Sequence, residues 1–305
     1  MCRINPRVDF AFKKLFGSEE NKDILIDFIN SVVSEKDRVF DIEIKNPYNA
    51  KNFRDDKLSI LDIKAVDSEG KWFNIEMQII DQEYYAKRAL YYWGRLYTEQ
   101  LKTGFNYDKL KKTIGINILN FNCIEGEKEY HNVYKLKNTR TEHELLDEME
   151  IHFIELEKYN ETMVTILDRW VNFLKKAGLY EPGGMPWELE NAPAIKKAMD
   201  TLNTMSFNDE EREIYEAGLK WMRDTEMGIL TADKKGFERG VAEGKAEGER
   251  SSLLILLKAK FGDEAYSLEP EIKAITDSSI LARLIAKAAE AKALQEFKKT
   301  LKMLE

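Results

Sequence analysis

The sequence predicts an α/β sandwich, in which helices flank a mixed β-sheet, followed by a helical C-terminal region. Residues 1–157 combine helical periodicity with short runs of alternating apolar residues, which is the pattern of an α/β domain. Glycine and proline cluster at residues 181–186 and mark a long turn, after which helical patterns dominate. We therefore expect a core over residues 1–157, a helical extension over 158–230 and a glycine-repeat helical tail over 231–305.

Two helices are expected before the first strands. An apolar stripe from Phe10 to Phe16 predicts a helix that stops at Gly17, and Asn21 is a suitable cap for a helix over residues 22–33. Three extended runs follow, at residues 39–44, 58–66 and 72–80. Because a polar turn sequence ending in Gly70 joins the last two runs, they predict a β-hairpin.

The rest of the core is expected to complete the sheet. Residues 82–103 predict a long helix that ends at Gly104. The apolar run at residues 113–119 is typical of a buried strand, and residues 130–136 and 149–156 predict two more strands. The order of elements, with a helix between the third and fourth strands, indicates a mixed sheet.

Charge and composition exclude several classes of protein. The chain has 47 Lys and Arg against 55 Asp and Glu, a net charge of −8, which excludes a globally basic nucleic-acid protein held by charge alone. Residues 1–120 contain 20 Lys and Arg against 19 Asp and Glu, so a polyanion would bind this part of the chain. Residues 1–6 do not have the apolar stretch expected of a signal peptide. The longest apolar run in the tail, residues 253–257, is too short for a membrane span. We expect a cytoplasmic protein without membrane contact.

Cysteine and histidine are scarce. Two cysteines, Cys2 and Cys123, exclude a disulfide scaffold and a cysteine-rich zinc site, and they fit a reducing compartment. The three histidines are scattered and are expected to be structural or exposed, as Cys123 is expected to be a small buried hydrophobe. Any catalysis must therefore depend on carboxylates, amides, lysines and arginines.

Two carboxylates interrupt strongly apolar strands of the predicted hairpin. A charge in a core strand costs several kcal/mol unless it is paired or binds a metal, and both Asp62 and Glu76 are in this position. Side chains alternate along a strand, so Lys64 shares a face with Asp62 and Gln78 shares one with Glu76. Such a patch suits Mg²⁺ or Mn²⁺. The alternative is a salt-bridged pair of Lys64 and Glu76 on a solvent-facing edge, and pairing alone favours neither.

The helix predicted at residues 82–103 interleaves aromatic rings and arginines. Arg88, Tyr91, Tyr92 and Arg95 occupy adjoining helical positions and offer phosphate contacts and stacking surfaces. The alternative is that the rings form the stripe that faces the sheet while arginines reach out to solvent. We expect this second role for Trp93 and Tyr97, and a substrate-facing role for Arg88.

Glycines recur every four residues in the tail, at positions 236, 240, 244 and 248. Each costs about 1 kcal/mol against alanine in a helix interior, and this spacing permits close approach by a partner helix. The alternative is a loosely helical linker. The apolar residues around Leu253–Leu257 and the amphipathic pattern at 280–293 predict a self-associating tail, and thus a homo-oligomer.

Four stretches occur in a fixed order along the chain. They are Asp9-Phe10-Ala11-Phe12-Lys13-Lys14-Leu15-Phe16-Gly17; Asp62 with Asn74-Ile75-Glu76-Met77-Gln78; Arg88, Tyr91, Tyr92, Gln100 and Gly104; and Gly236-Phe237-Glu238-Arg239-Gly240. In this order they resemble the PD-(D/E)XK nuclease-type transposase family, also called recombination-promoting nucleases (Rpn). The resemblance implies a restriction-endonuclease-like core and an Mg²⁺- or Mn²⁺-dependent DNA endonuclease with little sequence preference, acting in recombination or phage defence.

The resemblance also assigns roles to residues. It implies that Asp62, Glu76 and the Met77 backbone carbonyl bind the metal, that Gln78 belongs to the catalytic set, and that Arg88 and Tyr92 contact DNA. Two positions depart from the superfamily pattern, which has proline where this chain has Leu61 and lysine where it has Gln78. The glutamine is usual in this subfamily, and Lys64 is a hypothetical substitute for the missing cation. The superfamily often has a further acid of the site on its first helix, and Asp23 and Asp27, one turn apart, are the two candidates for it.

Two other functions fit parts of this pattern. Gln78 in place of lysine favours a non-catalytic nucleic-acid-binding or regulatory protein on a decayed nuclease fold. A protein that only binds partners through its tail is a third possibility, but it would not explain why Asp62 and Glu76 interrupt apolar strands.

Overall fold

The computed structural model describes residues 4–46, 62–81, 83–104, 106–181 and 183–304. The chain divides into two compact units, Met1–Arg223 and Asp224–Glu305. The long helix α8 (Asp209–Phe261) contributes residues to both. Across the part of the chain that is described, no helix has the length and apolar character needed to cross a membrane.

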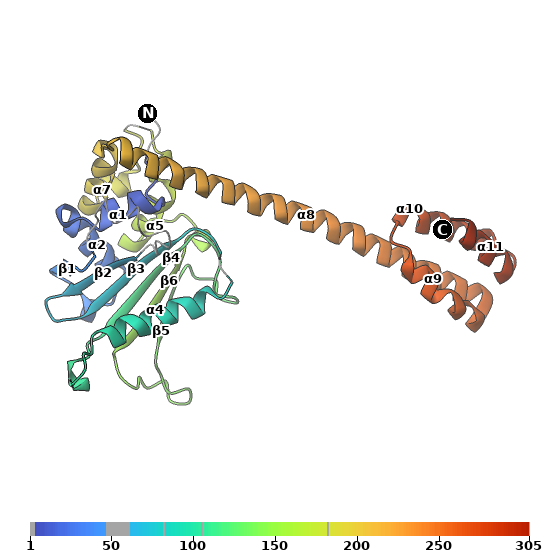
Figure 1. Cartoon of the computed structure of the whole chain (residues 1–305), viewed down its shortest axis with the longest axis horizontal. Helices are drawn as coiled ribbons and strands as arrows, with labels where there is room; N and C mark the ends of the chain where they lie inside the picture. The colour runs from blue at the N-terminus through green and yellow to red at the C-terminus, as the bar shows by residue number, and fades with distance from the viewer. Residues whose placement is uncertain (1–3, 47–61, 82, 105, 182, 305) are drawn as a thin grey trace. The chain divides into compact units, whose positions relative to one another are not determined.

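The first unit is built on one six-stranded mixed sheet (Figure 1). Its strands lie in the spatial order β1-β2-β3-β4-β6-β5. They are β1 (Ile42–Ile44), β2 (Asp62–Asp67), β3 (Trp72–Gln78), β4 (Thr113–Leu119), β5 (His131–Lys135) and β6 (Met149–Glu155). Strands β3, β4 and β6 are parallel, whereas β1, β2 and β5 run antiparallel to their neighbours. The predicted mixed sheet and β-hairpin are confirmed.

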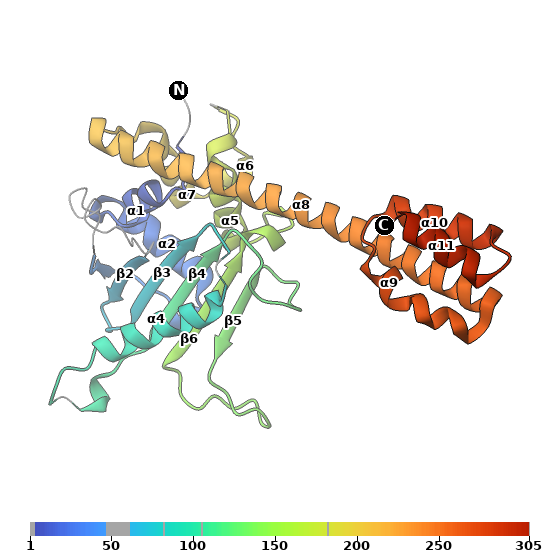
Figure 2. The same ribbon diagram turned by 45° about the vertical axis from the view of Figure 1, so that its right-hand side comes forward.

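Helices cover both faces of the sheet (Figures 1 and 2). Helix α4 (Tyr85–Glu99) lies on one face, over β3, β4 and β6. The other face meets a large apolar core that involves α1 (Asp9–Phe16), α2 (Lys22–Val32), α5 (Ile166–Lys176) and α7 (Pro193–Thr204). Short helical segments complete this unit: η1 (Glu19–Asn21), η2 (Glu35–Asp37), η3 (Tyr107–Lys109), η4 (Leu156–Lys158), η5 (Ala177–Leu179) and α6 (Trp187–Glu190).

The pattern of apolar residues explains which face each side chain takes. In β4, which is buried along its whole length, residues of one parity point to the large core, and the alternate residues point toward α4. Ile63, Ile75 and Ile116 are aligned across β2, β3 and β4 and belong to that core. Residues that alternate with these isoleucines along each strand, such as Glu76 next to Ile75, therefore lie on the α4 face.

Three local expectations need correction. The Asn21 side chain does not cap α2, because its Nδ2 donates to Ser18 Oγ instead. Helix α4 ends at Glu99 rather than at Gly104, and the Gln100 side chain then bonds the backbone of Lys111. Part of the predicted strand over residues 58–66 lies outside the described residues.

The second unit is a helical bundle with its own apolar core. The end of α8 packs with η6 (Gly262–Leu268), α9 (Glu269–Ala274), α10 (Ser278–Glu290) and α11 (Leu294–Leu304). Leu253 and Leu257 are fully buried there, and Leu254 and Leu256 are partly buried. The tail therefore buries one face of this helix within its own chain, because α10 and α11 fold back over it.

Candidate active site

Asp62 and Glu76 occupy directly opposite positions on the antiparallel strands β2 and β3. The backbone of Lys64, which has the same parity as Asp62, accepts a hydrogen bond from Lys45 on the side of β1. The backbone of Trp72, of the same parity as Glu76, bonds Lys112 on the side of β4. Asp62 and Glu76 thus form a non-hydrogen-bonded pair of the antiparallel ladder, at which Cα atoms are about 4.5 Å apart.

The Met77 carbonyl shares this location. Backbone groups alternate direction along a strand, and the Gln78 carbonyl accepts a hydrogen bond from Asn120 on the β4 side. The Met77 carbonyl, one residue earlier, therefore points to the opposite side, toward β2. This places a backbone oxygen next to Glu76 on the side of β2, and oxygen is the ligand type that Mg²⁺ and Mn²⁺ prefer.

The Glu76 carboxylate is buried and held by two hydrogen-bond donors. It is only 3% exposed. Asn74 Nδ2 donates to Glu76 Oε1 over 2.9 Å, and the Tyr85 hydroxyl, from α4, lies 3.3 Å from Oε2. The same hydroxyl lies 3.0 Å from Asn117 Oδ1, and Asn117 Nδ2 donates to the His152 carbonyl. These contacts fix the direction of the carboxylate.

The environment of Tyr85 keeps its hydroxyl protonated. Burial raises the pKa of Tyr85 well above its usual value, and the nearby Glu76 carboxylate raises this pKa further. Glu76 Oε2 and Asn117 Oδ1 can only accept hydrogen bonds, so the tyrosine must donate. Its single hydroxyl hydrogen is therefore shared between Glu76 and Asn117.

Lys64 and Gln78 flank the acidic pair. Lys64 lies opposite Asn74, two residues from Asp62 on the same face. Gln78 is buried, and its Nε2 donates to the Ile80 carbonyl over 3.3 Å. A Lys64–Glu76 pair on a solvent-facing edge does not match the structure, because Glu76 is buried in a strand with neighbours on both sides.

The chemistry of the donor set fits a divalent cation. Asn74 Oδ1 is buried and, among the described residues, accepts no hydrogen bond, so an oxygen with free lone pairs lies beside Glu76. Among the described side chains, no group of three or more His, Cys, Asp and Glu is placed to hold a metal ion. Any metal at Glu76 would also need backbone oxygens such as the Met77 carbonyl.

Neither acid proposed on the first helices lies on the Glu76 side of the sheet. Asp23 and Asp27 belong to α2, which packs on the opposite face. Asp23 forms an ion pair of 2.6 Å with Lys197, and Asp27 accepts a hydrogen bond from the Trp170 indole. Both have structural partners in this position.

Arg88 and Tyr92 follow Tyr85 along α4, one and two helical turns later. The Arg88 guanidinium stacks over Tyr85 at 5.8 Å and over Tyr92 at 5.3 Å from the ring centroids. Arg88 is thus coupled through Tyr85 to the residues around Glu76. The expected structural role of Trp93 and Tyr97 agrees with their positions, since the Trp93 indole donates to the Thr113 carbonyl and the two rings stack.

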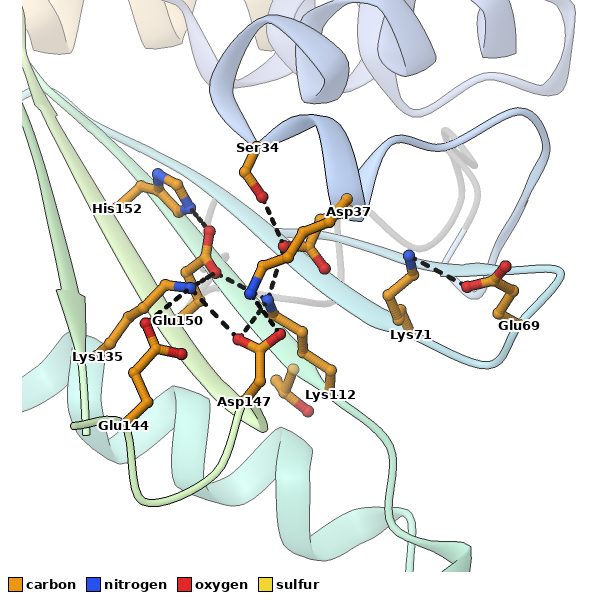
Figure 3. Close-up of polar contacts among 12 residues, drawn as sticks. Ser34, Asp37, Glu69, Lys71, Lys112, Lys135, Glu144, Asp147, Glu150 and His152 are labelled. Carbon is orange, nitrogen blue, oxygen red and sulfur yellow. Dashed lines mark hydrogen bonds and ion pairs between the residues drawn. The ribbon is translucent and has the colours of Figure 1, made fainter. Parts of the chain in front are cut away.

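A separate polar cluster lies on the opposite face of the sheet (Figure 3). The buried Glu150 carboxylate contacts Lys112 at 2.8 Å, Lys135 at 3.0 Å and His152 at 2.8 Å. Although burial opposes ionisation, these three partners hold the pKa of Glu150 well below its usual range. Asp37 and Asp147 complete the cluster through Lys112.

The histidines of this cluster have the structural role that the sequence suggested. His131 Nε2 lies 2.9 Å from His152 Nδ1, and the two rings stack. Burial, together with the neighbouring His152, lowers the pKa of His131 to about 4. His131 is therefore neutral at physiological pH, and the pair joins β5 to β6.

Sequence reasoning missed three residues around Glu76. The position of Asn74 could have been inferred from the alternation along β3, because Asn74 lies two residues before Glu76 and therefore takes the same face of the sheet. Asn117 interrupts the apolar strand β4 just as Glu76 interrupts β3, and this was an available signal. Tyr85 had no such signal, because its contact depends on how α4 packs on the sheet.

Comparison with known proteins gives one match. A family model described as PD-(D/E)XK nuclease family transposase matches residues 6–232. No curated protein and no solved structure matches at the significance required.

Proposed function

The chain belongs to the PD-(D/E)XK nuclease family transposases, and from this premise we propose that it is a metal-dependent endonuclease that hydrolyses DNA with little sequence preference. Members of the PD-(D/E)XK superfamily generally use divalent metal ions. Nuclease-like function follows from the family, whereas the choice of Mg²⁺ or Mn²⁺, a cytoplasmic location and a role in recombination or phage defence are parts of the proposal.

The observation that carries the proposal is the Asp62–Glu76 pair. The two acids lie opposite each other at a non-hydrogen-bonded position, and the Met77 carbonyl points toward the same place. We assign all three as ligands of the metal. Glu76 is only 3% exposed and accepts hydrogen bonds from Asn74 and Tyr85, so its carboxylate is held in place at this position.

A bound divalent metal polarises the phosphoryl oxygen and lowers the pKa of an attacking water. The protein residues orient and hold the reacting groups. Asn74 and Tyr85 fix the Glu76 carboxylate, and Lys64 places positive charge on the face where the phosphate lies. Gln78 occupies the position of the superfamily lysine, so Lys64 takes over its role in stabilising charge.

Arg88 and Tyr92 are assigned to DNA binding. Their helix lies over β3, which carries Glu76 and Met77, and the stacked Arg88 guanidinium has a restricted orientation. An ordered guanidinium suits a phosphate contact, and an adjacent tyrosine ring suits base stacking. DNA therefore approaches along α4.

The decisive experiment is cleavage of supercoiled plasmid with Mg²⁺, Mn²⁺ or EDTA. We expect nicked and linear products with either metal and none with EDTA. Asp62→Asn and Glu76→Gln should each reduce the rate by roughly 10³-fold, because metal-assisted stabilisation is worth several kcal/mol. Glu43→Gln, which changes an exposed carboxylate on β1, is the matched control and should cleave normally.

The rival function predicts a different result. A decayed nuclease would bind DNA but leave the plasmid intact with every metal, and this outcome would contradict the proposal. Equal cleavage by the wild type and both site variants, which are purified identically, would indicate a contaminating nuclease and would also contradict it. Thermal unfolding of each variant checks that the fold is retained.

A further inference from the structure

One face of α8 carries large apolar side chains that are exposed to solvent. They are Met227 (63% exposed), Leu230 (62%), Phe237 (74%), Val241 (54%) and Ile255 (69%), all in the second unit. They occupy five of the nine positions that a heptad repeat with spacings of three and four places between residues 227 and 255, and the other four are Lys234, Gly244, Gly248 and Ser251. Single exposed apolar residues are ordinary, but several on one stripe of a helix mark an interaction surface.

This apolar stripe is not the face that α8 uses within its own chain. Ala246, Leu253 and Leu257 are the residues of α8 that are buried in the helical bundle. Ile255 lies two positions from both leucines, roughly 200° around the helix, and remains exposed. The bundle therefore leaves the stripe uncovered.

Gly244 and Gly248 continue the stripe between Val241 and Ile255. A Cβ atom added at either glycine would meet nothing within 4 Å, so no described residue of this chain approaches them. Each glycine weakens the helix by about 1 kcal/mol relative to alanine. Two small residues in the middle of an apolar stripe leave room for large side chains from a partner.

We propose that the stripe pairs with the same stripe of a second copy of this chain, with the two helices antiparallel. If the two-fold axis passes between residues 242 and 243, each heptad position of one helix lies opposite a heptad position of the other. Phe237 then lies opposite Gly248 of the partner, and Val241 lies opposite Gly244. Leu230 lies opposite Ile255 at each end. Large residues meet glycines in the middle, Leu230 and Ile255 meet toward each end, and Lys234 lies opposite Ser251 between them.

Charge complementarity supports the same alignment. Glu238 and Lys245 flank the stripe on one side and are exposed. In the antiparallel pair, Glu238 of one copy lies beside Lys245 of the other, and symmetry makes this contact twice. A two-fold interface of this kind is self-complementary and closes as a dimer.

The parallel arrangement lacks both kinds of complementarity. It would place Lys234 against Lys234 in the seam and Phe237 against Phe237, with glycine facing glycine. It would also bring Asp233 of one helix near Glu238 of the other, which are like charges at flanking positions. The pattern of sizes and charges thus selects the antiparallel dimer.

The first test measures self-association of the full-length chain by sedimentation equilibrium. We expect a dimer at micromolar concentration. Gly244→Leu and Gly248→Leu should each raise the dimer dissociation constant by roughly 5- to 150-fold, the equivalent of the 1–3 kcal/mol that overpacking a close contact costs. Gly236→Leu is the matched control, because residue 236 is an exposed helical glycine off the stripe. All three changes improve helix propensity, so helix unfolding cannot explain a selective loss.

The second test determines the orientation of the helices. Glu238→Lys and Lys245→Glu should each weaken the dimer, and the double variant should restore it, because the exchange rebuilds the pairs between copies. A monomeric wild type, or equal weakening by Gly236→Leu, would overturn the interface. A dimer that is insensitive to both charge reversals would overturn the antiparallel orientation.

Discussion

Asp62 and Glu76 face each other across β2 and β3 at a position where the two strands exchange no backbone hydrogen bonds. The Glu76 carboxylate is fixed by Asn74, two residues away on the same face of β3, and by Tyr85 from α4. Under the proposed function this carboxylate binds the metal, so changes in the groups around it should alter metal binding and cleavage.

Tyr85→Phe should weaken metal binding while leaving the fold intact. The change keeps the ring that packs edge-on against Phe121 but removes the donor to Glu76 and Asn117. Loss of an outer-shell partner typically reduces metal affinity 10- to 100-fold, so Mn²⁺ titration followed by calorimetry should show a drop in that range. Tyr91→Phe, at an exposed position of the same helix, is the control. Unchanged Mn²⁺ affinity in Tyr85→Phe would show that this hydroxyl has only a packing role.

Lys64→Ala should reduce cleavage by roughly 10²-fold, the effect of removing one preorganised donor to the reacting group. The combination of Lys64→Ala with Gln78→Lys should recover part of this loss, because it returns a cation to the superfamily position. Single-turnover rates on plasmid DNA measure both effects. Lys45→Ala, a neighbouring lysine paired with Glu43, serves as the control. Normal cleavage by Lys64→Ala would remove the proposed role of this residue.

Arg88→Ala should weaken DNA binding and make it less sensitive to salt. If Arg88 contacts a phosphate, its loss reduces the slope of log affinity against log salt by about one. Fluorescence anisotropy with a short duplex at several salt concentrations gives this slope. Arg95→Ala is matched in charge and helix, but Arg95 is paired with Glu99 at 2.7 Å and should have little effect. The same slope for Arg88→Ala and wild type would assign Arg88 to the structure of α4.

Acid should destabilise the first unit through His131. The pKa of this histidine is about 4 in the folded protein and near 6.5 when unfolded, so the unfolded chain binds more protons between these values. The neutral His131 therefore lowers the free energy of folding by its full amount above pH 6.5, and this stabilisation is lost as the pH falls toward 4. Urea unfolding at pH 7.5 and pH 5 should show a smaller loss of stability for His131→Asn than for wild type. His143→Asn, at an exposed histidine, should behave like wild type. Parallel pH dependence in all three proteins would contradict this prediction.

The order of elements and the pairing of the two acids could be predicted from the sequence. Alternating apolar residues determine the face of each strand, and a tight polar turn ending in Gly70 determines the register of the hairpin. These are local properties, so Asp62 and Glu76 could be placed together before any tertiary contact was known. The end of α4 could not be placed this way, because Gln100 leaves the helix to bond the backbone of Lys111.

The tertiary structure alone decided how the site and the tail are completed. Tyr85 reaches Glu76 only because α4 packs across β3 and β4, and no periodicity in either segment encodes that contact. Likewise, α10 and α11 cover Leu253 and Leu257 but leave Phe237 and Val241 exposed. Sequence periodicity gives the apolar faces of a helix, but which of these faces is covered depends on contacts between segments that are distant along the chain.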